Sequence, residues 1–276
     1  MLSPIRGRAV LLILACWALA NALVYFGLRD QPGKSGSHRR PSQRTLSLYM
    51  ASQYRRVDSG SSIRESLPYR LLSPVNLIPD TQYPLVVFLH GAGEKGDDNQ
   101  LQLLGLPEQM AESRWQKRFP CYLLAPQCSP DFHWSNHEED LVALIRQLRG
   151  QQAVDPQRIY LTGLSMGGFG CWSLAAREPD LFAAVVPICG GGEPSTAERL
   201  VGVPIWAVHG DADDAVPVQY SRDMIAAIRR AGGTPAYSEL KGVGHDSWTQ
   251  TYRDPDGVLK WMFEQRQASD ESRSTH

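Results

Sequence analysis

Short runs of consecutive apolar residues alternate with amphipathic segments of helical period along most of this chain. Continuous apolar runs of this length are typical of strands buried on both faces of a parallel sheet. The predicted strands are residues 67–72, 84–90, 121–126, 158–162, 181–188, 204–210 and 236–240, with the first at an edge. The predicted helices are residues 101–113, 138–149, 221–230 and 258–266. This alternation predicts an α/β fold with a mostly parallel central sheet and helices on both faces.

The amino-terminal part of the chain does not follow this alternation. Arg6 and Arg8 precede an apolar run, residues 9–28, which only Asn21 interrupts. This layout is typical of an export signal, so we expect the domain that follows to be exported, periplasmic or extracellular. A run of about 20 residues also suffices to cross a bilayer once, so residues 1–28 fit either a cleaved signal peptide or an uncleaved membrane anchor. The run continues past Cys16, which argues against a lipoprotein signal ending there.

The remaining boundaries follow from composition. Residues 29–60 are rich in Gly, Ser, Pro and basic side chains, which predicts a flexible linker. Beside an anchor, its basic residues would also be placed to contact anionic lipid headgroups. The alternating pattern assigns residues 61–267 to one folded domain and leaves residues 268–276 as a polar tail.

Composition and charge narrow the classes of function. The 276 residues are 42% hydrophobic and 21% charged, which suits one sizeable α/β domain with a full core. A net charge of -1, with no stretch that alternates bases and aromatics, argues against a nucleic-acid partner. Without a close CxxC pair, the cysteines indicate neither a zinc ribbon nor a dense disulfide scaffold. Whether disulfides form is left open for Cys121, Cys128, Cys171 and Cys189.

A serine flanked by glycines follows the predicted strand 158–162. The spacing Gly163-x-Ser165-x-Gly167 suits a sharp strand-to-helix turn, where a strained serine backbone tolerates no bulky neighbours. Such a turn would expose the hydroxyl of Ser165 and direct the amide of Met166 at the same reacting atom. Because a pattern this short also arises by chance, Ser165 is a candidate nucleophile only if the chain supplies its partners.

A serine nucleophile needs a histidine base and an acid that fixes the tautomer of that base. On a sheet of this kind the chain order is serine, acid, histidine. His209 precedes the available acids and His276 lies in the polar tail, which leaves His245 as the candidate base. Three carboxylates compete for the role of acid, and their spacing does not choose among them: Asp211, Asp213 and Asp214.

Other groups would complete an active site. A glycine-rich segment around Ala92 follows the predicted strand 84–90. Its amides would either join that of Met166 in an oxyanion hole or simply form a tight turn. Trp134 and Trp248 are candidate walls of an apolar substrate pocket, although a packing role fits Trp134 equally well. His133 and His137 are spaced for a metal, but no further ligand cluster accompanies them, so we expect neither a metal nor another cofactor.

Taken together, these residues resemble the α/β-hydrolase superfamily. Within it they are similar to the branch of predicted peptidases and carboxylesterases that includes proteins like dienelactone hydrolase and polyhydroxybutyrate depolymerase. The resemblance covers about residues 67–263 and rests on the segments 90–99, 163–170, 209–217 and 244–248. In that family the pattern His-Gly-x-x-Asp-x-x-Val-Pro carries the acid at its fifth position, and this resemblance implies that the acid is Asp213.

The resemblance and the residues together predict an exported serine hydrolase that cleaves carboxylic esters through an acyl-enzyme. Ser165 would attack, His245 would act as base and Asp213 would support it. The expected substrate is a small-molecule or polymer ester, with a possible membrane tether through residues 9–28. Two alternatives stay open: a serine peptidase on the same triad, and a tethered binding protein without catalysis. Esters come first because their leaving groups need less protonation than those of amides.

Overall fold

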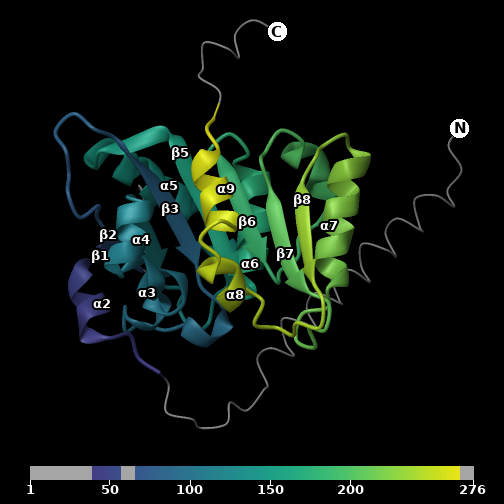
Figure 1. Ribbon diagram of the computed structural model, residues 1–276, viewed down its shortest axis with the longest axis horizontal. Coiled ribbons are helices and arrows are strands. Elements are labelled where there is room, and N and C mark those ends of the chain that lie inside the picture. The colour runs from purple at the N-terminus through teal and green to yellow at the C-terminus, as the bar shows by residue number, and fades with distance from the viewer. Residues whose placement is uncertain (1–38, 57–65, 268–276) are drawn as a thin grey trace, which may run out of the picture. The chain divides into compact units, whose positions relative to one another are not determined.

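The computed structural model describes residues 39–56 and 66–267 of the chain. The described residues from Arg40 onward belong to one compact unit (Figure 1). The predicted signal or anchor at residues 1–28 and the polar tail at 268–276 lie outside the described residues. None of the helices in the described parts of the chain has the length and apolarity of a membrane span.

Eight strands of the described residues form one sheet in the order β1-β2-β4-β3-β5-β6-β7-β8. Strand β2 pairs antiparallel with both β1 and β4. All the remaining neighbouring pairs, from β4 to β8, are parallel. The strands are β1 Tyr49–Tyr54, β2 Leu67–Leu72, β3 Tyr83–Leu89, β4 Tyr122–Pro126, β5 Val154–Leu164, β6 Ala184–Ile188, β7 Trp206–Gly210 and β8 Ala236–Leu240. The predicted α/β class with a mostly parallel sheet is therefore confirmed.

Helices cover both faces of the sheet, which explains why β3, β4 and β6 are buried along their whole length. One hydrophobic core joins the sheet to α5 (Glu138–Gln151), α6 (Met166–Arg177) and α7 (Gln219–Arg230). The other core includes residues of the helices in front of the sheet in Figure 1. These helices are α3 Leu106–Met110, α4 Ser113–Arg118, α8 Trp248–Arg253 and α9 Val258–Glu264.

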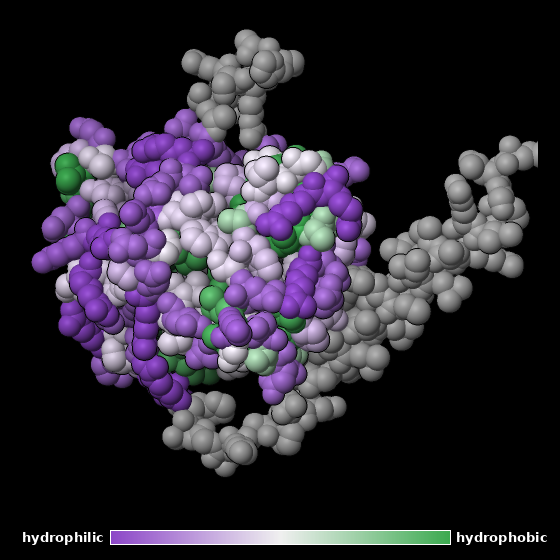
Figure 2. Space-filling model, turned by 45° about the vertical axis from the view of Figure 1, so that its right-hand side comes forward, coloured by the Kyte–Doolittle hydropathy of each residue, from purple (hydrophilic) through white to green (hydrophobic). Residues whose placement is uncertain are grey.

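Short helical elements complete the described fold. They are the helix α2 Gln43–Leu48 and the 3-10 helices η1 Ala92–Glu94, η2 Leu101–Leu103, η3 Trp134–Asn136 and η4 Pro194–Leu200. The face drawn in Figure 2 is mostly hydrophilic, with small separate hydrophobic patches. This surface is normal for a domain that buries its apolar residues against the two faces of a sheet.

The structure corrects the expected start of the folded domain. Residues predicted as flexible linker form α2 and β1, and β1 pairs with β2 from Tyr49↔Leu72 to Tyr54↔Leu67. Tyr49 is buried, and its hydroxyl donates a hydrogen bond of 2.8 Å to the carbonyl of Pro107. The boundary predicted at residue 61 is therefore too late, and the edge strand is β1 instead of β2. The apolar pattern missed β1 because most of its side chains face solvent.

The single helix predicted over residues 101–113 is also wrong. The structure has η2 and α3 there, and α4 begins only at Ser113. Gly105 stands between η2 and α3 with a φ of 78°, a conformation that favours glycine and ends a right-handed helix. Pro107, which has no N–H to donate, then occupies the first turn of α3, where the loss is tolerated.

Candidate active site

Ser165 lies at the turn between β5 and α6. Its φ of 52° is in the left-handed region, which is strained for a residue other than glycine. A Cβ at Gly163 or Gly167 would overlap the carbonyl oxygen of Leu89, so both flanking positions need glycine for the close approach of β3. The turn expected from the spacing of these glycines is thus the one that the chain forms, with Ser165 immediately before the helix.

The structure brings Ser165, Asp213 and His245 together from three separate connections. Nε2 of His245 lies 3.0 Å from Oγ of Ser165, and Nδ1 of His245 lies 2.8 Å from Oδ2 of Asp213. Ser165 follows β5, Asp213 lies in the loop after β7, and His245 lies between β8 and α8. Because these strands are parallel, their carboxyl ends meet at one edge of the sheet, where ligands bind in open α/β folds.

Of the three candidate acids, the geometry brings only Asp213 to His245. The carboxylate of Asp211 instead accepts a hydrogen bond of 2.6 Å from the amide of Gly242, and Asp214 is exposed. The third histidine weighed from the sequence, His276, lies outside the described residues.

The carboxylate of Asp213 is fully buried and has hydrogen-bond donors on both oxygens. Oδ1 accepts bonds of 2.9 Å from the amides of Ala215 and Val216, and Oδ2 accepts from His245 and from His209. Burial alone would raise the pKa of Asp213, but the hydrogen bonds of His209, His245 and the Val216 amide hold this pKa well below its ordinary value. Asp213 is therefore a carboxylate at neutral pH.

The contact between His209 and Asp213 was not expected from the sequence. Nε2 of His209, at the end of β7, lies 3.2 Å from Oδ2 of Asp213, the oxygen that also faces His245. The chain order excluded His209 as the base. Chain order carries no information about further contacts of the acid. The spacing of four residues between a strand end and the acid was the available signal.

The two amides expected at an oxyanion hole lie on segments that meet at the same edge of the sheet. Met166 is the first residue of α6, where backbone N–H groups have no partner within the helix. Ala92 begins η1, three residues after Leu89, which ends β3 and pairs with Gly163. A Cβ at Gly91 would touch the side chain of Leu164, so the segment before Ala92 packs against the end of β5.

The buried ring of His90 holds this glycine-rich segment through contacts of both its nitrogen atoms. Its Nδ1 lies 2.6 Å from the carbonyl of Gly91, and its Nε2 accepts a hydrogen bond of 3.0 Å from the amide of Cys128. Burial lowers the pKa of His90 to about 4, so the ring is neutral. Since a carbonyl only accepts, the proton of the neutral ring lies on Nδ1.

The two tryptophans expected at a pocket have different surroundings. Trp134 is only 1% exposed, and its indole N–H donates a bond of 3.0 Å to the carbonyl of His90. A side chain this buried packs under the glycine-rich segment, so the interpretation of Trp134 as a pocket wall is wrong. Trp248 is half-buried, and its ring meets that of His245 edge to face at a centroid distance of 5.4 Å.

The cysteines of the described residues are free and buried, at positions 121, 128, 171 and 189. In the same part of the chain, Cys189, Asp213 and His245 are the group whose metal-ligating atoms all lie within 4.8 Å of one another. Sγ of Cys189 lies 3.3 Å from the amide of Ser165, and Asp213 and His245 hydrogen-bond to each other. We therefore assign these side chains to the hydrogen-bond network around Ser165.

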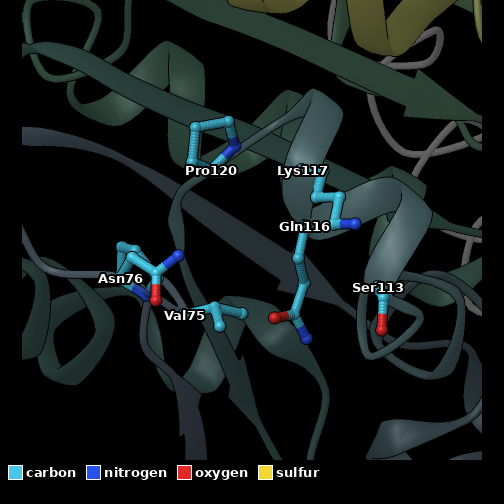
Figure 3. Close-up of a pocket in the computed structure, with 7 residues that line it drawn as sticks. Val75, Asn76, Ser113, Gln116, Lys117 and Pro120 are labelled. Carbon is cyan, nitrogen blue, oxygen red and sulfur yellow. The ribbon is translucent and has the colours of Figure 1, made fainter.

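A separate pocket of about 350 Å³ lies between the loop after β2 and the helix α4 (Figure 3). Its lining residues are Pro74, Val75, Asn76, Ser113, Gln116, Lys117 and Pro120. These residues precede β3 and β4 in the chain, so the pocket is at the amino ends of these parallel strands. It is therefore distinct from the site around Ser165, which is at the carboxyl ends.

Comparison with known proteins gives the family. The model of the dienelactone hydrolase family matches residues 131–269, a range that contains Ser165, Asp213 and His245. The chain belongs to the dienelactone hydrolase family. Its membership agrees with the resemblance drawn from the sequence, and the eight-stranded sheet agrees with the fold of α/β-hydrolases.

Individual relatives match parts of this dienelactone hydrolase family member. A putative esterase, NocK, of Nocardia uniformis subsp. tsuyamanensis is 39% identical over 77 residues, which are 27% of this chain and 22% of NocK. A solved thermostable esterase is 38% identical with a TM-score of 0.74, over 81% of this chain and 64% of the esterase. The acylaminoacyl peptidase of Pyrococcus horikoshii has a TM-score of 0.60 at 16% identity, over 83% and 44% of the two chains, which shows a shared fold alone. The chain thus spans less than two thirds of each of these relatives.

Proposed function

We propose that this protein is an exported serine hydrolase that cleaves carboxylic esters through an acyl-enzyme. One observation carries the proposal: a continuous hydrogen-bonded path runs from Oγ of Ser165 through His245 to a buried carboxylate, Asp213. A serine hydroxyl becomes a useful nucleophile only with such a base and acid beside it. Membership of the dienelactone hydrolase family and similarity to proteins named as esterases support the same chemistry.

The first half of the reaction forms the acyl-enzyme. Oγ of Ser165 attacks the ester carbonyl carbon while Nε2 of His245 takes the hydroxyl proton. Asp213 accepts a hydrogen bond from the Nδ1–H of the resulting imidazolium and stabilises its charge. The amides of Met166 and Ala92 donate hydrogen bonds to the oxyanion of the tetrahedral intermediate. The intermediate collapses as the bond to the alkoxy group breaks, and His245 gives its proton to the departing alcohol.

The second half releases the acid. A water molecule attacks the acyl carbon and gives a proton to Nε2 of His245. As the second tetrahedral intermediate collapses, it expels Oγ of Ser165, and Nε2 of His245 returns the proton to that oxygen. The products are a carboxylic acid and the free enzyme. The substrate is a small-molecule or polymer ester, and the half-buried ring of Trp248 beside His245 supports a partly apolar pocket wall.

The test compares Ser165→Ala with Ser173→Ala on p-nitrophenyl acetate. Ser173 lies on the same helix, α6, and its exposed hydroxyl bonds to Glu138. Ser165→Ala is expected to lose several orders of magnitude in kcat, down to the ~10³-fold acceleration that positioning and the oxyanion hole leave. Ser173→Ala is expected to match the parent. Equal rates for Ser165→Ala and the parent would refute the assignment of the nucleophile.

A serine peptidase is the second candidate, favoured by the fold shared with the acylaminoacyl peptidase. Amide cleavage demands stronger protonation of the leaving group than ester cleavage, so a matched pair of substrates separates the two. We expect the p-nitrophenyl ester of an acyl group to react while the p-nitroanilide of the same group does not. For a binding protein without catalysis, a fluorophosphonate would leave no adduct on Ser165.

Export rests on the amino-terminal sequence, where Arg6 and Arg8 precede the apolar residues 9–28. We propose that this segment acts as a signal peptide or as a membrane anchor that tethers the hydrolase. Mass spectrometry of the mature protein separates the two, because only a cleaved signal removes these residues. A protein that keeps them and fractionates with the cytoplasm would contradict export.

A further inference from the structure

Two buried polar residues, His209 and Ser221, link Asp213 back to the backbone of Ser165. We call this closed path of hydrogen bonds, which includes the short backbone segment 188–190, the ring. From Oδ2 of Asp213 the ring passes to Nε2 of His209 at 3.2 Å. From Nδ1 of His209 it passes to Oγ of Ser221 at 2.8 Å, and the carbonyl oxygen of Gly190 lies 2.9 Å from the same Oγ. His209 is the second-last residue of β7 and Ser221 lies on α7, so the ring joins elements that flank the site.

The ring returns to Ser165 through the end of β6. Gly190 follows Cys189, and the amide of Ser165 donates a bond of 3.0 Å to the carbonyl of Ile188 on the same short segment. The sulfur of Cys189 lies 3.3 Å from that amide as well. The segment 188–190 therefore holds the backbone of Ser165 at one side and Ser221 at the other.

The two bridging residues are buried where apolar side chains would be expected. His209 is 0% exposed and Ser221 is 1% exposed. Polar groups at such positions are destabilising unless hydrogen bonds satisfy them, and both groups here are satisfied only within the ring and by the carbonyl of Val216 at 2.9 Å from Nε2 of His209. A carbonyl only accepts, so Nε2 carries a hydrogen and presents it to Val216 and Asp213.

We infer that His209 and Ser221 are positioning residues, which set the distance between the turn that carries Ser165 and the loop that carries Asp213. This inference rests on the proposed hydrolase function, and neither residue touches the reacting atoms. Asp213 lies between exposed residues of its loop, Ala212 and Asp214, so contacts from the interior must hold it. A misplacement of about 1 Å at such a site lowers a rate by about 10²-fold.

The experiment removes the bridge without touching the triad. Ser221→Ala deletes the hydroxyl between His209 and Gly190. The matched control is Thr162→Val on β5, which deletes another fully buried hydroxyl that bonds to a strand carbonyl, that of Val186 at 2.8 Å. Both variants are expected to lower Tm by similar amounts, because each loses two buried hydrogen bonds. Ser221 loses those with Nδ1 of His209 and the carbonyl of Gly190, and Thr162 loses those with the carbonyl of Val186 and, at 2.8 Å, the hydroxyl of Tyr252.

The two variants are expected to differ in catalysis. With p-nitrophenyl acetate, Ser221→Ala is expected to lower kcat between about 10-fold and about 10²-fold with KM unchanged. The reason is that the distance between the turn of Ser165 and the loop of Asp213 is no longer fixed by the ring. Thr162→Val is expected to keep the parent kcat. A role of Ser221 in stability alone would lower Tm in both variants and leave both kcat values at that of the parent, which would overturn the inference.

Variants of His209 add an independent measurement. His209→Gln retains an N–H near the position of Nε2 and loses the contact with Ser221, so its kcat is expected to match that of Ser221→Ala. The double variant, His209→Gln with Ser221→Ala, is expected to lose nothing further, since both changes break the same ring. Losses that multiply in the double variant would contradict the ring.

The parent protein separates this inference from the function on which it rests. Turnover of the parent and fluorophosphonate labelling of Ser165 are measured first. A parent that neither turns over ester nor takes the label overturns the proposed function and this inference with it. An active parent whose Ser221→Ala and His209→Gln variants keep its kcat overturns this inference alone.

Discussion

Replacing Asp213 by asparagine perturbs the site at one pair of atoms, and the structure allows the consequence to be worked out. All four groups around the carboxylate are donors: the amides of Ala215 and Val216 face Oδ1, and His209 and His245 face Oδ2. An asparagine side chain offers one oxygen and one NH₂ group. Whichever way it turns, its NH₂ group meets two donors.

The orientation of the new amide decides which property suffers. If NH₂ faces the histidines, His245 must turn its proton from Nδ1 to Nε2, and a protonated Nε2 cannot accept the proton of Ser165. That loss of the base lowers kcat by about 10⁴-fold in a known serine protease triad. If NH₂ faces the two backbone amides, each mismatched buried donor destabilises the fold by about 1–3 kcal/mol. Against a total stability of about 5–15 kcal/mol, two such mismatches would be plain in a urea denaturation.

The assay measures kcat with p-nitrophenyl acetate and the free energy of unfolding for Asp213→Asn and for a control, Asp214→Asn. Asp214 is exposed in the same loop and was an equal candidate for the acid on spacing alone. We expect Asp213→Asn to lose activity, stability or both, and Asp214→Asn to match the parent in each. The reasoning is refuted if Asp213→Asn retains parental kcat and stability, or if Asp214→Asn is the inactive variant.

Further measurements test the surroundings of the site. The pKa of Asp213 lies below its value of ~3.9 in an unfolded chain, so its carboxylate stabilises the fold above that pH and this stabilisation is lost as the pH falls toward the folded pKa. The difference in unfolding free energy between the parent and Asp213→Asn is therefore expected to shrink from about pH 6 to about pH 2 in urea titrations. Burial raises the pKa of Cys189 to about 12, so a thiol reagent is expected to leave the native protein active and to modify Cys189 only in urea, as mass spectrometry of the labelled peptide would show. Gly167→Ala forces a Cβ onto the backbone oxygen of Leu89 and is expected to lower Tm strongly, whereas Gly150→Ala, near the end of α5 and without a neighbour within 4 Å, is expected to keep or raise Tm. A Gly167→Ala variant as stable as Gly150→Ala would contradict the close approach of β3.

The central strands could be predicted because burial on both faces leaves a continuous apolar signal, as in β3. The same logic fails at the edge of the sheet. Strand β1 buries Tyr49 and exposes most of its other side chains, so composition alone made it resemble the linker before it. The helix predicted over 101–113 failed for a local reason, the left-handed conformation of Gly105.

The candidate site divides in a similar way. Chain order and the family pattern were enough to nominate Ser165, Asp213 and His245, because their order follows from the succession of parallel strands. The bond between His209 and Asp213 depends on how the loop after β7 folds back, which no periodicity records. Trp134 was ambiguous because an indole suits a pocket wall and a core equally, and only its burial under His90 decides between them.

The position of Ser165 in the chain has a consequence for the protein during its synthesis and folding. Ser165 precedes His245 by 80 residues, and β7 and β8 must both be added to the sheet before acid and base reach it. A chain still emerging from the ribosome therefore carries its serine without any means of activating it. The proposed hydrolytic activity would begin only when the last strands are in place, so turnover itself reports that folding has finished.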